Sequence, residues 1–137
     1  MSRFTSLLEL YSSAERDAKI ELGRRMHLRD QLAAQRDALI AQRLAAGEGA
    51  IAVQLHEQYM SYWRGMQTRI VHFEAEMAKA DQAINEARKK LAEAHQRRIT
   101  IDKLRERDAA AARVRDARRE QRFQDERAAI AWTKERS

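Results

Sequence analysis

Cysteine and proline are missing from this chain of 137 residues, and glycine and aromatic residues are scarce. Without cysteine the chain has no disulfide, no thiolate metal site and no cysteine nucleophile, which suits a reducing compartment such as the cytosol. Without proline, and with 4 glycines, it has few residues that interrupt a helix. Aromatic residues make up 6% of the chain, which does not suit a large globular core.

Long hydrophobic runs are also absent. No apolar stretch approaches the roughly 18 residues that a membrane-spanning helix needs. The first residues, Met1 to Glu9, contain no apolar core of the kind found in secretory signals. The sequence therefore predicts a protein that is soluble, or at most peripheral to a membrane, with no transmembrane segment.

Charged residues, in contrast, make up 35% of the chain, and the net charge is +6. Together with abundant alanine, leucine and glutamine, this composition is typical of long helices that bury one seam. Apolar residues recur at helical spacing, which argues against disorder. We therefore expect an elongated all-α protein.

One short stretch interrupts the good helix formers. Gly47 and Gly49 lie within Ala46–Ala50, and glycine costs a helix interior roughly 1 kcal/mol relative to alanine. Glycine is also the commonest residue in the left-handed position that ends a helix. The stretch predicts a single coiled-coil domain over residues 1–137, with helix 1 at about 4–45, a turn at 46–50 and helix 2 at about 50–130. The fold class is all-α, an antiparallel two-helix coiled-coil hairpin with a longer second helix.

The second predicted helix carries the clearer seam. Its apolar residues alternate in steps of four and three, as in a two-stranded coiled coil, at Phe73, Met77, Ala80, Ile84, Ala87, Leu91 and Ala94. A turn at Gly47–Gly49 would set Phe4 opposite about residue 92, near the point where this seam fades. The last ~35 residues would then have no partner within the chain, and an isolated helix is marginal in water.

Catalytic chemistry finds no support in the sequence. There is no glycine-rich phosphate loop and no arrangement of serine, histidine and aspartate that a hairpin would assemble. None of the four histidines has a histidine or cysteine partner at the helical spacing of metal ligands: His27, His56, His72 and His95. We expect no catalytic residue, no metal site and no cofactor.

Aromatic residues gather just after the predicted turn. Tyr59, Tyr62 and Met66 share one helix face, and Trp63 follows Tyr59 by four residues on its flank. Two interpretations remain open. The cluster either seals the end of the hairpin or forms an exposed patch for a partner, since tyrosine and tryptophan are effective anchors at interfaces.

The C-terminal third is rich in arginine, above all in residues 113–122. A phosphate-binding face needs uncompensated Lys and Arg, whereas Asp116, Glu120, Asp125 and Glu126 interrupt this one. A basic-zipper helix would also place its basic region before the heptads rather than after them. A basic coiled coil that binds nucleic acid or an anionic surface is thus an alternative of a different class, and the sequence argues against it.

The C-terminal residues carry a family resemblance. The run Lys103-Leu104-Arg105-Glu106-Arg107 is followed about fifteen residues later by Glu120-Gln121-Arg122-Phe123-Gln124-Asp125-Glu126-Arg127-Ala128. With a hairpin interrupted by glycine and a tyrosine-rich second helix, the chain resembles the FliJ family of the bacterial flagellar export apparatus. The first helix is shorter and the arginine content higher than is usual there. Injectisome stalk proteins share the architecture, so an injectisome role is the nearest alternative.

The resemblance implies a non-enzymatic coiled-coil stalk for flagellar type III protein export and motility. Its partners would be the hexameric export ATPase, the cytoplasmic domain of the export-gate membrane protein, and export chaperones. Its place would be the cytoplasmic face of the inner membrane at the flagellar base. By this analogy the ATPase contact is assigned to Arg105, Arg107, Arg115, Arg118 and Arg122. The gate or chaperone contact is assigned to Tyr59, Tyr62, Trp63, Met66 and Phe73.

Overall fold

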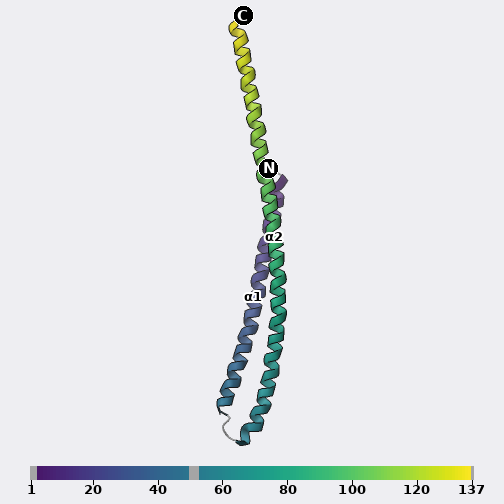
Figure 1. Cartoon of the computed structure of the whole chain (residues 1–137), viewed down its shortest axis with the longest axis vertical. Coiled ribbons are helices and arrows are strands. Elements are labelled where there is room, and N and C mark those ends of the chain that lie inside the picture. The colour runs from purple at the N-terminus through teal and green to yellow at the C-terminus, as the bar shows by residue number, and fades with distance from the viewer. Residues whose placement is uncertain (1–2, 50–52, 137) are drawn as a thin grey trace. The chain divides into compact units, whose positions relative to one another are not determined.

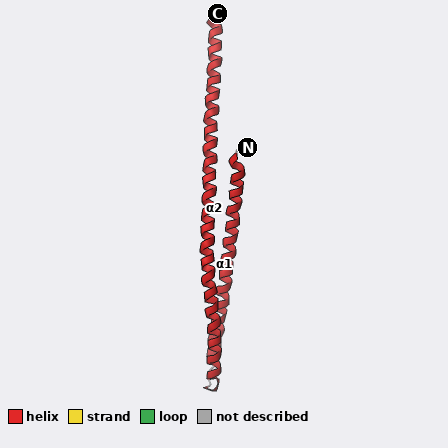
Figure 2. Ribbon diagram, turned by 90° about the vertical axis from the view of Figure 1, so that its right-hand side faces the viewer, coloured by secondary structure: helices red, strands yellow, loops and turns green. Residues whose placement is uncertain are grey.

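Two long helices make up the part of the chain that the structure describes. The computed structural model describes residues 3–49 and 53–136, and every residue in these ranges is helical (Figure 2). Helix α1 spans Arg3–Gly49 and helix α2 spans Val53–Arg136 (Figure 1). The two helices pack against each other in opposite directions. This confirms the predicted fold class, an antiparallel two-helix hairpin with a longer second helix.

The contacts divide the chain, which the sequence predicted as one domain, into two compact units. One unit contains residues 14–94, which hold the end of α1 and the beginning of α2. The other contains residues 1–13 together with residues 95–137.

The unit of residues 14–94 is held together by the seam that the sequence predicts for α2. Most of the predicted seam positions are buried, and Phe73 and Leu91 are half-buried. Leu39 of α1 packs with Met66 and Ile70 of α2, and Phe73 lies against this cluster. The buried apolar residues of α2 are Met66, Ile70, Met77, Ala80, Ile84, Ala87 and Ala94.

The side of the seam that α1 contributes is far more polar. Leu39 is the one apolar residue of α1 that is buried in the described ranges. Arg29, Arg36 and Arg43 recur every seven residues, and each is half-buried. Long arginine stems cover apolar surface while their charged ends reach water. The hairpin therefore pairs an apolar seam on α2 with a mixed leucine and arginine seam on α1.

Helix α1 continues through most of the predicted turn. Residues 46–49 are helical and Gly47 has no left-handed backbone angle, so it does not end the helix as expected. Ala50, the last residue of the predicted turn, lies outside the described residues. A cost of roughly 1 kcal/mol per glycine is small beside the combined helix propensity of the alanines and arginines that precede Gly47.

The longer α1 changes the pairing of the two helices. Arg29 Nε donates to Asp81 Oδ1 at 3.1 Å, and Arg43 donates to Gln67 across the two helices. Residues 29 and 81 lie 26 positions on either side of residue 55, and residues 43 and 67 lie 12 positions on either side of it. The centre of pairing is therefore residue 55, not Gly47–Gly49.

The other unit shows the consequence for the N-terminus. Residues 3–13 of α1 belong with the segment of α2 that begins at His95, so the expected position of Phe4 opposite residue 92 was too early. Half-buried residues continue along this segment as far as Ala112. From Arg113 to Arg136 every side chain is exposed. The segment in which every side chain is exposed is thus residues 113–136, which is shorter than the ~35 residues expected from the hairpin register.

Candidate partner-binding surfaces

The aromatic cluster at the beginning of α2 is largely occupied by contacts with α1. Tyr59 is half-buried and lies against Gly47, where a Cβ atom would stand 2.6 Å from the tyrosine Oη and 3.3 Å from Cζ. Any larger residue at position 47 would displace the ring. Gly47 therefore allows the two helices to approach closely at Tyr59, and it does not form a turn.

Trp63 is held by a second cross-helix contact. The guanidinium carbon of Arg43 lies 5.2 Å from the centroid of the Trp63 ring, within the range of a cation–π interaction. The same arginine donates a hydrogen bond to Gln67 Oε1, one turn further along α2. Arg43 was absent from the predicted site, although its seven-residue spacing from Arg36 and Arg29 marks it as a seam position.

Of the five residues predicted to contact the export gate or chaperones, Tyr62 is the most open. Met66 is buried at 4% exposure, and Phe73 packs on the cluster of Leu39, Met66 and Ile70. Tyr62, in contrast, is 42% exposed. Tyr59, Trp63, Met66 and Phe73 thus pack within the hairpin, and Tyr62 is the most exposed of the five.

The second predicted site lies on the exposed segment of α2. Arg107, Arg115, Arg118 and Arg122 are all exposed. Arg105 differs, because it is half-buried and donates to Asp102 Oδ1 at 2.8 Å, one turn earlier. The structure therefore leaves four of the five predicted arginines open to a partner and engages the fifth within its own helix.

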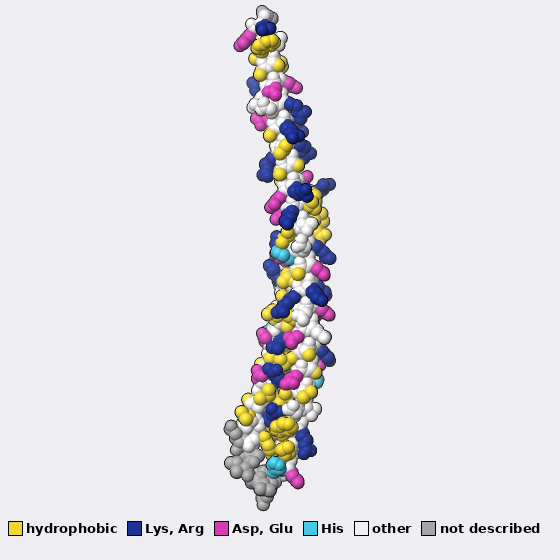
Figure 3. All heavy atoms as spheres, in the orientation of Figure 1, with side chains coloured by type: hydrophobic (Ala, Val, Ile, Leu, Met, Phe, Trp, Pro, Cys, Tyr) yellow, Lys and Arg dark blue, Asp and Glu magenta, His cyan; other side chains and the backbone are white. Residues whose placement is uncertain are grey.

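Arg119, which was not among the predicted site residues, completes this basic surface. Arg115, Arg118, Arg119 and Arg122 follow the spacing i, i+3, i+4, i+7, which places them on one helix face. Residues 113–136 hold eight basic and five acidic side chains, an excess of three. Figure 3 shows blue and magenta side chains interspersed along this segment. Four of the eight basic residues therefore share one face, and acidic residues are interspersed along the segment.

The exposed segment also presents large apolar side chains. Val114, Phe123 and Trp132 are 50%, 57% and 57% exposed and lie nine residues apart. Nine residues correspond to about two and a half helical turns, so successive members of this series point to opposite faces. Arg127 and Arg136 lie over the Phe123 and Trp132 rings, at 5.7 Å and 4.2 Å from the centroids. The segment has apolar anchors on two opposite sides.

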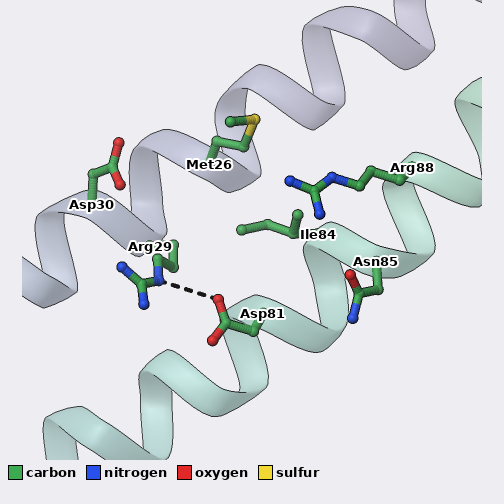
Figure 4. A pocket seen from close by; sticks show the side chains of 7 residues that line it. All are labelled: Met26, Arg29, Asp30, Asp81, Ile84, Asn85 and Arg88. Atoms are coloured by element: carbon green, nitrogen blue, oxygen red, sulfur yellow. Dashed lines mark hydrogen bonds and ion pairs between the residues drawn. The ribbon is translucent and has the colours of Figure 1, made fainter.

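A shallow groove runs between the helices in the unit of residues 14–94 (Figure 4). Its volume is about 400 Å³, and the ion pair between Arg29 and Asp81 bridges it. The guanidinium of Arg88 reaches over Ile84 toward Met26. The groove is lined by Met26, Arg29, Asp30, Asp81, Ile84, Asn85 and Arg88.

The histidines have ordinary surroundings. His27 Nε2 and Gln31 Nε2 lie at hydrogen-bonding distance, 3.1 Å, and the His72 ring lies edge-on to Phe73 at 5.9 Å. Within residues 3–49 and 53–136, no three side chains of the metal-binding types come together. Neither described helix has a stretch apolar and long enough to cross a bilayer.

Neither the curated proteins nor the solved structures include a match to this chain. A protein-family model described as "Flagellar FliJ protein" matches residues 1–137, which is the whole chain. The hairpin, its longer second helix and its exposed basic end agree with that match. The chain belongs to the FliJ family, and is therefore a component of flagellar type III protein export.

Proposed function

We propose that this protein is the coiled-coil stalk that links the hexameric export ATPase to the export gate. In this proposal residues 113–136 of α2 enter the ATPase ring, and the beginning of α2 contacts the gate's cytoplasmic domain or export chaperones. The protein acts at the cytoplasmic face of the inner membrane at the flagellar base. Its role is mechanical and requires no catalytic group from this chain.

One observation carries the ATPase part of the proposal. Val114, Phe123 and Trp132 are exposed on alternating opposite faces of a single helix. A partner helix or a flat groove would cover only one of these faces. A partner that surrounds the helix, as a ring does, would bury all three anchors at once. Exposed aromatic side chains of this kind are the usual anchors of interfaces.

The charge of the segment supports the same contact. Arg115, Arg118, Arg119 and Arg122 form one basic face, and arginine pairs well with carboxylates through two parallel hydrogen bonds. Acidic side chains inside the ring would therefore steer and hold the segment. The acidic residues between the arginines weaken any uniform attraction to nucleic acid.

In this proposal Tyr62 makes the contact with the gate or with a chaperone. This ring is 42% exposed, whereas its aromatic neighbours pack on α1. Gly65, one turn later, has open space where a Cβ would be. Tyr62 is therefore accessible from the side and is the most exposed member of the predicted set.

Binding to purified export ATPase, measured together with ATP hydrolysis, tests the stalk proposal. We expect the full-length chain to bind and to stimulate hydrolysis. Reversal of Arg115, Arg118 and Arg122 to glutamate should weaken binding by at least tenfold, about 1.4 kcal/mol, and leave helicity unchanged. The matched control reverses three exposed basic residues of the other unit: Arg16, Arg24 and Arg64.

Two results would contradict the proposal. The first is an absence of both binding and stimulation by the unaltered chain. The second is equal weakening by the two triple reversals, because net charge rather than the face of residues 115–122 would then explain the contact.

A further inference from the structure

Helix α1 carries a second row of side chains beside the seam that faces α2. The row steps four and three residues alternately through Met26, Asp30, Ala33, Asp37, Ile40 and Leu44. Met26, Ile40 and Leu44 are 44%, 37% and 66% exposed. Alternating steps of four and three are the spacing with which a helix packs against another helix. The row is therefore suited to a third helix that the hairpin does not contain among its described residues.

The exposed segment of α2 carries a row with the same spacing. It steps through Asp116, Glu120, Phe123, Arg127, Ile130 and Lys134, and Phe123 and Ile130 are 57% and 59% exposed. Both rows thus mix two or more large apolar residues with charged residues. The α1 row has two aspartates, whereas the α2 row has Asp116 and Glu120 in its first half and Arg127 and Lys134 in its second half.

The two rows match in one parallel register. When Met26 lies beside Phe123, Ala33 lies beside Ile130, so that a small residue faces a large one. The same register sets Asp30 beside Arg127. It also sets Asp37 beside Lys134. Between Met26 and Asp37 each apolar position therefore faces an apolar position, and each aspartate faces a basic residue. Ile40 and Leu44 lie beyond the position of Lys134 in this register and are not covered by residues 116–134.

Other registers lose this match. A shift of one heptad in one direction keeps Ile40 beside Ile130, but it sets Asp30 beside Glu120. The same shift sets Met26 beside Asp116 and Leu44 beside Lys134. A shift in the other direction sets Phe123 beside Lys19. An antiparallel arrangement sets Asp30 and Asp37 against Phe123 and Ile130, because a positions then face d positions. Like charges and buried unpaired carboxylates are both costly in such a contact. The parallel register is selected by charge and by size together.

The groove of Figure 4 lies where Phe123 would dock. Met26 and Asp30 form its α1 side, and Ile84 and Arg88 form its α2 side. An aromatic ring at this place would contact the Met26 thioether and the Arg88 guanidinium, both favourable neighbours of an aromatic ring. Within the described residues, no hydrogen bond or ion pair holds Asp30, which leaves its carboxylate open to a basic partner.

We infer that the occupant of the α1 row is residues 116–134 of a second copy of this chain. The two copies associate with α1 of one running parallel to the C-terminal segment of the other. Association covers Phe123 and Ile130, so it competes with any other partner of that segment, including the ATPase ring proposed above. The inference itself rests on the two rows and not on the proposed function.

Cysteine cross-linking tests the contact directly, because the chain contains no cysteine of its own. One chain carries Ala33→Cys and a second, distinguishable in size, carries Ile130→Cys. We expect a disulfide between the two chains under mild oxidation. In the matched control the first chain carries Ala38→Cys, an exposed alanine on another face of α1, and we expect little cross-linking.

Charge exchange gives a second, independent readout. Asp30→Arg or Arg127→Asp alone should weaken self-association, measured by sedimentation velocity, about tenfold or more. Both substitutions in one chain should restore it, because the pair is re-formed with its signs exchanged. Asp17→Arg, at an exposed position away from the row, is the control and should leave association unchanged. Circular dichroism confirms that each variant stays helical.

Three outcomes would overturn the inference. The first is a chain that stays monomeric at all concentrations. The second is a double charge variant that associates as weakly as the single variants. The third is a chain with both Ala33→Cys and Ile130→Cys that closes within itself while the separate chains do not cross-link. Loss of self-association with intact ATPase binding would leave the proposed function standing.

Discussion

At the scale of single residues, Gly47 determines how closely Tyr59 approaches α1. A methyl group there would meet the Tyr59 Oη at 2.6 Å, whereas nothing lies within 4 Å of a Cβ built at Gly65. Gly65→Ala should therefore raise the free energy of unfolding by about 0.5–1 kcal/mol through helix propensity alone. Gly47→Ala should give a smaller gain or a loss, because the ring has to move. Thermal melts of both variants measure the difference, and equal gains would contradict the role assigned to Gly47.

Tyr62 and Trp63 are neighbours in sequence with different expected roles. Trp63 is stacked by Arg43, so Trp63→Ala should lower the melting temperature of the hairpin. Tyr62 is 42% exposed, so Tyr62→Ala should leave the melting temperature nearly unchanged and weaken binding to the gate domain or a chaperone. Melting curves and pull-down of both single variants separate the two effects. A large drop in the melting temperature of Tyr62→Ala would assign Tyr62 to sealing as well.

At the scale of the helices, the seam depends on few residues of α1. Leu39 is 5% exposed and packs on Met66 and Ile70, while Leu28 is 47% exposed. Leu39→Ala should lower the free energy of unfolding by about 2–3 kcal/mol, near the lower end for buried leucines because the cluster is small. Leu28→Ala should cost well under half as much. Urea titrations followed by circular dichroism give both values, and similar losses would show that the seam is not centred on Leu39.

At the scale of the whole molecule, residues 113–136 form a helix that adds no buried surface to the described chain. A chain that ends at Ala112 should therefore unfold at nearly the same temperature as the full chain. Its helical signal should fall roughly in proportion to the residues removed, and its binding to the export ATPase should be lost. A marked fall in the melting temperature would indicate that the segment stabilises the hairpin.

The sequence predicted more of the fold than of the sites. Steps of four and three from Phe73 to Ala94 indicated the α2 seam correctly, because buried helix faces repeat with that spacing. Helix 1 was expected to end at about residue 45, whereas α1 continues to Gly49, because a cost of roughly 1 kcal/mol per glycine is small beside the helix propensity of the preceding residues. The role of Arg43 was missed, because a cross-helix contact depends on register, and register follows from where α1 ends.

By itself, the sequence determined that the chain is helical, that it lacks proline and cysteine, and that its C-terminal end is basic. These properties follow from local propensity and composition, which need no tertiary information. Only the tertiary structure decided that pairing is centred on residue 55, that Tyr59 packs on Gly47, and that Tyr62 stays exposed. It also decided that Ala112 is the last half-buried residue of α2 in the described ranges. The physical reason is that exposure depends on which residue of the other helix lies opposite, and a shift of a few residues changes that partner.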